Sequence, residues 1–194
     1  MAVLHRPLFW LLPLAADTPL CISEQERLWS EPLQPSLQQR CQANPQPALA
    51  VPLLSPPGKA PQLTGGQGYV SLSHSRDQLL LAWSPWPIGV DLEWQKRALQ
   101  ADVLAQRFFT ARECQQLQIL QPAARRAAVL ESWVRKEAAI KWQGSSLASD
   151  LRHWQWDREL QQLQHLQQGL RPCCRCEQRE GWLCAVVGEA VDLG

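Results

Sequence analysis

The distribution of proline decides which parts of this chain can form long helices. Eight of its fifteen prolines lie between Pro32 and Pro61, and no long helix fits there, because proline lacks an amide hydrogen and its ring clashes with the preceding helical turn. Later in the chain, Pro122 stands where the first position of a helix is expected, and Gly144 stands where that helix would end. Residues 123–143 are therefore predicted to form the main helix of the chain.

Short apolar runs bounded by turn residues predict strands before and after a chain break at Pro85 and Pro87. The expected strands are residues 8–16, Tyr69–Ser75, Gln78–Ser84, Ile88–Trp94 and a hairpin over residues 171–187 that turns near Glu180 and Gly181. Further helices are expected from the capping pair Ser23 and Glu26, over residues 101–109, and from the capping pair Thr110 and Glu113. The pattern predicts a mixed α and β protein.

Composition excludes several classes of partner. The chain has 194 residues, a net charge of +1 and no apolar run near the roughly 20 residues of a membrane-spanning helix, so we expect neither nucleic acid nor a membrane as partner. Residues 8–16 weakly resemble a signal peptide, but Pro13 and Asp17 favour a buried first strand. Seven cysteines, an odd number spread over the chain, indicate reduced thiols and a cytoplasmic location.

Two carboxylates stand together in one predicted strand. Asp91 and Glu93 flank Leu92, and both project from the same face because side chains alternate along a strand. Neighbouring carboxylates repel each other unless a cation lies between them, which favours a hard divalent metal ion. The alternative is an ordinary solvated strand end.

The main predicted helix offers a third carboxylate beside a lysine. Glu137 and Lys141 are four residues apart and share a face with Trp133. Such a pair suits a phosphate ester with a bridging metal, the acid binding the metal and the ammonium group the phosphate oxygens. An ordinary surface ion pair is the alternative, although Trp133 and Ile140 indicate that this face is partly buried.

A histidine with hydroxyl neighbours lies at the end of an earlier predicted strand. His74 stands between Ser73 and Ser75, and these groups can hydrogen-bond phosphate oxygens. A purely structural histidine is the alternative.

The order and spacing of these segments resemble one known family. The matching segments are SLSHS (71–75), GVDLE (89–93), RFFTAREC (107–114) and WVRKEAAIK (133–141), with PGKAP (57–61) as a degraded G-K-P element. Over about residues 59–154 the chain resembles the 4′-phosphopantetheinyl transferase superfamily, in its Sfp-like branch. The resemblance implies an α+β fold of two similar subdomains in a pseudo-twofold arrangement, each a small antiparallel sheet packed on a long helix, here residues 1–86 and 87–194.

The resemblance also implies a reaction and a set of site residues. The enzymes of this family transfer the phosphopantetheine arm of coenzyme A to a serine of an apo acyl or peptidyl carrier protein and release 3′,5′-ADP. By matched position, Asp91, Glu93 and Glu137 would hold Mg²⁺, Glu137 would be the general base, and Lys141 would neutralise charge at the diphosphate. The expected coenzyme A contacts are Lys59, Ser73, His74 and Lys141, with Arg40 as a candidate for the 3′-phosphate.

Other expectations concern partners. The carrier protein would dock near residues 109–120 with Arg107 and Arg112, because carrier helices are acidic, and fused halves favour a monomer. Two alternatives remain open at this point. The same carboxylates could serve a metal-dependent phosphodiesterase, or the chain could be a non-catalytic paralogue acting as an interaction protein.

Overall fold

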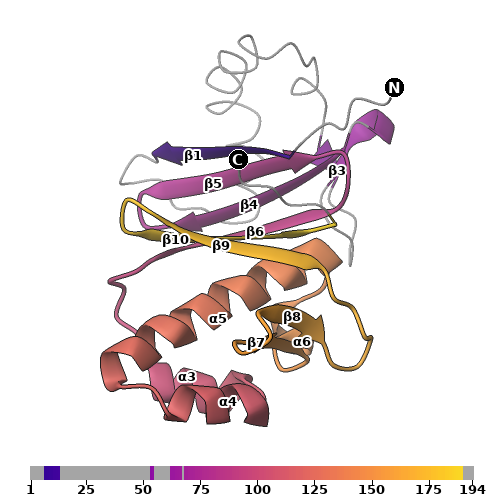
Figure 1. The fold of residues 1–194 in the computed structure, drawn as a ribbon. Coiled ribbons are helices and arrows are strands. Elements are labelled where there is room, and N and C mark those ends of the chain that lie inside the picture. Colours follow the sequence, from indigo (N-terminus) through magenta and orange to yellow (C-terminus); the bar gives the residue numbers. More distant parts are fainter. Residues whose placement is uncertain (1–6, 14–52, 55–61, 67, 190–194) are drawn as a thin grey trace.

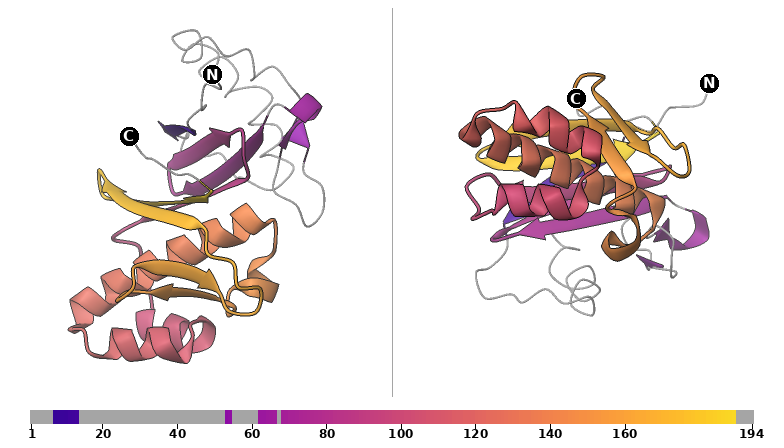
Figure 2. Two further views of the ribbon diagram at one scale, coloured as in Figure 1. Left: turned by 45° about the vertical axis from the view of Figure 1, so that its right-hand side comes forward. Right: turned by 90° about the horizontal axis from the view of Figure 1, so that it is seen from below.

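The computed structural model describes residues 7–13, 53–54, 62–66 and 68–189, and every structural statement below concerns these residues. They form successive layers, with two antiparallel sheets, a long helix beneath the second sheet, and two shorter helices with a two-stranded ribbon below it (Figures 1 and 2). The expected α+β class with small antiparallel sheets is confirmed. The pseudo-twofold relation and the subdomain boundary after residue 86 stay predictions.

The first sheet is built from the N-terminal half of the chain. Its strand order is β1-β5-β4-β3-β2, and all of its pairs are antiparallel. The strands are β1 (Leu8–Pro13), β2 (Leu53–Leu54), β3 (Gln62–Leu63), β4 (Tyr69–Ser75) and β5 (Gln78–Ser84), with a short 3-10 turn η2 (Thr64–Gly66) after β3. The predicted first strand is confirmed over β1, and the helix expected at Ser23 lies outside the described residues.

The second sheet combines the middle of the chain with its C-terminal hairpin. It has the order β6-β10-β9, from β6 (Ile88–Trp94), β9 (Cys173–Arg179) and β10 (Trp182–Gly188). The hairpin turns at Glu180 and Gly181, which both have positive φ angles (49° and 85°), as a tight two-residue turn requires. The predicted hairpin is therefore confirmed.

The helices are α3 (Ala101–Phe108), α4 (Ala111–Gln118), α5 (Pro122–Gln143) and α6 (Leu147–Asp150), followed by the ribbon β7 (Trp154–Asp157) and β8 (Gln162–His165). Two of the helices, α4 and α5, begin where the sequence predicts, whereas the sequence analysis did not predict α6 or the ribbon β7–β8. Thr110 and Glu113 form both bonds of a capping box at the start of α4. Pro122 occupies the first turn of α5, and Gly144 ends that helix with φ 75°. No helix in the described part of the chain is long and apolar enough to cross a membrane.

A buried ion pair holds α4, α5 and β7 together. Lys136 of α5 is fully buried and donates to Glu113 of α4 and to the carbonyl of Phe108, both at 3.1 Å. The Glu113 carboxylate also accepts the backbone amides of Thr110 (2.9 Å) and Trp156 (3.1 Å). A buried charge pair is costly unless further hydrogen bonds support it, and here the acid accepts two amides while the ammonium group also donates to a carbonyl. Two of the motifs noted in the sequence, RFFTAREC and WVRKE, therefore meet at this pair.

Gly89 allows α5 to lie directly on β6. A Cβ atom at this position would come within 2.0 Å of the carbonyl oxygen of Ala138 and within 2.4 Å of the amide nitrogen of Trp142. Both clashing atoms belong to the helix backbone, so neither can rotate away as a side chain could. This close approach brings the middle of α5 next to the strand that carries Asp91.

We expect Gly89→Ala to lower the free energy of unfolding by about 3 kcal/mol, because the added methyl group must push α5 away from β6. Urea denaturation measures this loss. Gly66→Ala is the control, since a Cβ there meets no atom within 4 Å and only the positive φ of 70° is strained; it should cost about 1–2 kcal/mol. A Gly89→Ala protein no less stable than Gly66→Ala would contradict the packing described here.

Candidate active site

Serine side chains join the two sheets. Three hydroxyls on β4 accept hydrogen bonds from three backbone amides of β6, an edge strand of the second sheet. The pairs are Val90 to Ser71 (2.9 Å), Leu92 to Ser73 (3.1 Å) and Trp94 to Ser75 (3.4 Å). The constant offset of 19 residues means that β4 and β6 run side by side in the same direction. The serines thus satisfy amides that an unpaired edge would leave without partners.

Two of these serines also orient the carboxylates of β6. The Ser73 hydroxyl donates to Asp91 Oδ1 at 2.7 Å, and the Ser75 hydroxyl donates to Glu93 Oε2 at 2.9 Å. Each hydroxyl thus accepts from one amide of β6 and donates to the carboxylate of the residue before it. The alternating serines of β4 therefore hold both acids of the D-x-E motif.

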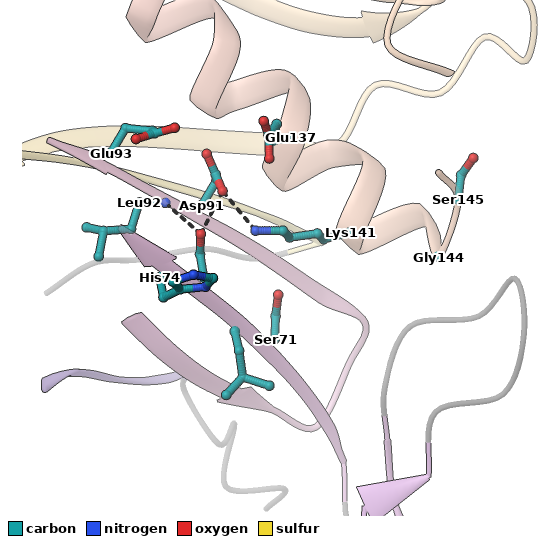
Figure 3. Close-up of a pocket in the computed structure, with 11 residues that line it drawn as sticks. Ser71, His74, Asp91, Leu92, Glu93, Glu137, Lys141, Gly144 and Ser145 are labelled. Carbon is teal, nitrogen blue, oxygen red and sulfur yellow. Dashed lines mark hydrogen bonds and ion pairs between the residues drawn. The ribbon is translucent and has the colours of Figure 1, made fainter. Parts of the chain in front are cut away.

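The acids of β6 and the polar residues of α5 line one cleft of about 410 Å³. In Figure 3, Asp91 and Glu137 point toward each other across this cleft, and Lys141 reaches Asp91 from one turn further along α5. The Lys141 ammonium lies 2.8 Å from Asp91 Oδ1. The remaining lining residues are Ser71, Leu72, Ser73, His74, Leu92, Glu93, Gly144 and Ser145. The predicted site residues on the two distant segments are therefore brought together.

Each of the two facing carboxylates lacks part of the compensation that a buried acid needs. Asp91 is 3% exposed, and its Oδ2 atom is buried without a hydrogen-bond partner. Burial, with the nearby charge of Asp91, raises the pKa of Glu137 to about 8, although Lys141 and Arg97 act in the opposite direction. A cation between these two groups would relieve both problems.

Glu93 is arranged differently from Asp91. Its side chain is 15% exposed, and both of its carboxylate oxygens have partners: Ser75 binds Oε2, and the Arg97 guanidinium binds Oε1. In Figure 3 its side chain lies at the end of the cleft away from Lys141. The two acids of the D-x-E motif therefore lie on the same face of β6 but differ in their hydrogen bonds, because only Asp91 keeps an oxygen without a partner.

These residues fit a divalent cation held by two protein carboxylates. Within the described residues, no three His, Cys, Asp or Glu side chains are placed to hold a metal ion together. Asp91 Oδ2, which has no hydrogen-bond partner, and the Glu137 carboxylate, whose pKa is raised, could nevertheless act together as metal ligands. Mg²⁺ is commonly bound by one or two carboxylates together with substrate phosphates. A metal site that also includes Glu93 stays a prediction.

Of the remaining residues predicted to contact coenzyme A, two line the cleft and two lie outside the described residues. His74 lines the cleft at its exposed rim, where partial burial and the Lys141 ammonium lower the pKa of the imidazole. The Ser73 hydroxyl already serves Asp91 and Leu92, so it acts here by orienting the acid. Lys59 and Arg40 lie outside the described residues.

The sequence analysis did not anticipate the roles of Ser71, Ser75 and Arg97. Serines at every second position of β4, next in order to a D-x-E strand, are the signal for the first two. Arg97, four residues after Glu93, follows the strand, where no periodicity relates the two side chains, and the sequence carried no signal for their contact.

Comparisons with known proteins identify the family of the chain. Residues 87–187, just over half of the chain, match the sequence profile of the 4′-phosphopantetheinyl transferase superfamily. The chain is also 39% identical over 84 residues to the 4′-phosphopantetheinyl transferase psf-1 of Bacillus pumilus, a match that covers 43% of this chain and 35% of that protein. The chain belongs to the 4′-phosphopantetheinyl transferase superfamily, and its similarity to this relative supports the Sfp-like branch.

We expect Ser73→Ala to weaken divalent cation binding, because Asp91 loses the hydroxyl that orients it. Ser71→Ala is a matched control, since Ser71 accepts an amide of β6 but donates to no carboxylate of the described residues. Both variants should lower the free energy of unfolding by about 1–3 kcal/mol, the cost of a buried amide left unpaired. Urea denaturation and Mn²⁺ titration measure the two effects; equal Mn²⁺ affinity in both variants would contradict the orienting role of Ser73.

We expect the metal-free protein to lose stability as the pH rises from 5 to 8. Glu137 keeps its proton in the folded state up to a pKa of about 8, whereas the unfolded chain releases it near 4.5, so the folded state binds more protons in this window. Glu137→Gln removes this titration and should flatten the dependence. Thermal unfolding in EDTA measures both proteins, and equal slopes would contradict the raised pKa.

Proposed function

We propose that this protein transfers the 4′-phosphopantetheine arm of coenzyme A to a serine of an apo carrier protein and releases 3′,5′-ADP. The observation that carries the proposal is the convergence of Asp91, Glu137 and Lys141 in one cleft, in a chain of this superfamily. In this reaction the serine oxygen forms a new bond to the phosphorus of the pantetheine phosphate. The bond from that phosphorus to the bridging oxygen of the diphosphate breaks, and the serine proton must be accepted by a base.

The cleft residues supply charge and position for this step. Lys141 places an ammonium group where charge develops on the departing phosphate oxygens, and Ser73 keeps Asp91 in its orientation. Mg²⁺ bound to Asp91 and Glu137 would supply Lewis-acid polarisation of the diphosphate. Phosphoryl transfer makes few covalent demands on a protein, so fixed charges and alignment are the main contributions.

Glu137 is our candidate for the general base. In the metal-free protein its pKa is raised to about 8, and a cation bound beside it would lower that pKa, so that the ionised carboxylate could accept the serine proton directly or through a metal-bound water. Lys141 and Arg97 favour its ionised form. The exposed His74 at the rim of the cleft is our candidate for contact with the nucleotide end of coenzyme A, with Lys59 and Arg40 as further candidates from the sequence.

The carrier protein is expected to approach the helical layer formed by α3 and α4. Arg107 and Ile119 are exposed there, and Ile119 is 82% exposed. Arg112 is a weaker candidate than the sequence indicated, because its guanidinium already pairs with Asp157 (2.5 Å) and Glu159 (3.1 Å). A cytoplasmic monomer that does not bind nucleic acid or membrane completes the proposal.

Intact-mass analysis of an apo carrier protein incubated with this protein, coenzyme A and Mg²⁺ tests the proposed function. We expect a gain of about 340 Da, the mass of one phosphopantetheine group. Cleavage of coenzyme A without any carrier would indicate a phosphodiesterase, and binding without either product would indicate a non-catalytic interaction protein. Either outcome would contradict the proposal.

We expect Lys141→Ala to lower kcat roughly 10²–10³-fold, because the lost charge acts mainly in the transition state. Lys96→Ala is the matched control, since Lys96 is an exposed lysine close to β6 that is not among the residues lining the cleft. Steady-state kinetics of carrier modification separate kcat from KM. A loss confined to KM would assign Lys141 to ground-state binding and contradict this role.

A further inference from the structure

Arg97 binds Glu93, an acid of the cleft whose two carboxylate oxygens both have partners. The Arg97 guanidinium binds Glu93 Oε1, and Ser75 binds Glu93 Oε2, whereas Asp91 keeps Oδ2 without a partner. Both acids come from the same strand and the same face, so the difference lies in their partners. The guanidinium is therefore what separates Glu93 from the Asp91–Glu137 pair.

The backbone that carries Arg97 is held in place at several points. Its amide donates to the carbonyl of Trp94 (3.0 Å), and the neighbouring Gln95 amide donates to the carbonyl of Gly181 (3.1 Å). Arg126, from α5, donates to the carbonyls of both Gln95 (2.9 Å) and Arg97. The turn after β6 is thus tied to the turn between β9 and β10 and to α5, and the backbone position of Arg97 is fixed by the fold.

The chemistry of a guanidinium suggests what would displace Glu93. Its donors fit a phosphate as well as a carboxylate. The Arg97 side chain is 36% exposed and binds Glu93, a residue that lines the cleft, so its guanidinium is open to an anion beside Glu93. It is also close enough to Glu137 to influence that carboxylate electrostatically. An anionic diphosphate in the cleft would therefore compete with Glu93 for Arg97.

We propose that Arg97 is a positioning residue that holds Glu93 away from the metal in the free protein and releases it when the diphosphate of coenzyme A binds. The free protein then offers two carboxylates, Asp91 and Glu137, and the third becomes available only with substrate present. This inference rests on the proposed function, because it concerns the same metal and the same diphosphate. It makes cation affinity and coenzyme A affinity mutually dependent.

The test is the Mn²⁺ affinity of the free protein, measured from the electron paramagnetic resonance signal of unbound Mn²⁺. We expect Arg97→Ala to bind Mn²⁺ about tenfold more tightly than the wild type, because Glu93 is freed to act as a ligand. Arg97→Lys, which keeps a cation beside Glu93, should stay near the wild type. Lys96→Ala controls for the loss of one positive charge near the site.

A double-mutant cycle separates ligation from simple charge removal. Glu93→Gln should hardly change Mn²⁺ affinity in the wild type, where Glu93 is bound to Arg97, but should cancel the tenfold gain in Arg97→Ala. Equal effects of Glu93→Gln in both backgrounds would overturn the proposal, as would an Arg97→Ala protein that binds Mn²⁺ no more tightly. With saturating coenzyme A, the difference between the wild type and Arg97→Ala should shrink, and a constant tenfold difference would contradict the release step.

Asp91→Ala distinguishes the failure of this inference from the failure of the proposed function. If Asp91→Ala abolishes Mn²⁺ binding but Arg97→Ala changes nothing, the metal site stands and the role of Arg97 is wrong. If Asp91→Ala leaves Mn²⁺ binding unchanged, the metal lies elsewhere and both proposals are wrong. Circular dichroism confirms that each variant is folded before it is titrated.

Discussion

The site depends on hydrogen bonds in which one serine hydroxyl serves two partners. Ser73 accepts the amide of Leu92 and donates to the carboxylate of Asp91, so a single oxygen both fastens β6 to β4 and sets the direction of the acid. Because the hydroxyl hydrogen points at the acid, the oxygen lone pairs stay available to accept the amide. The same hydrogen bonds therefore join the two sheets and orient the acid of the candidate active site.

Two carboxylates at the cleft each form an ion pair with a basic side chain, whereas Glu137 has a raised pKa. Lys141 faces Asp91, and Arg97 faces Glu93, while Glu137 forms no ion pair with another described residue and has its pKa raised to about 8 by burial and the charge of Asp91. Protonated Glu137 leaves these pairs neutral at pH 7. A cation would compensate the carboxylates of Asp91 and Glu137, and an anionic substrate would compensate the cationic groups of Lys141 and Arg97. If the two bind together, the net charge of the cleft changes little.

The sequence predicted the elements better than the way they meet. Prolines, capping residues and apolar runs gave the main helix from Pro122, the capping box at Thr110 and the strands around Asp91, because these signals are local. The convergence of the acids was expected only through the family resemblance. The need for Gly89 and the pairing of Arg97 with Glu93 depend on backbone approach and turn position in three dimensions, which residue spacing does not encode.

The most direct measurement is anomalous diffraction from crystals of the protein grown with Mn²⁺ and coenzyme A. We predict a Mn²⁺ peak within coordination distance of Asp91 Oδ2 and of the Glu137 carboxylate, with the diphosphate on the side of Lys141. A peak outside this cleft, or a diphosphate bound away from Lys141, would contradict the assignment of the site.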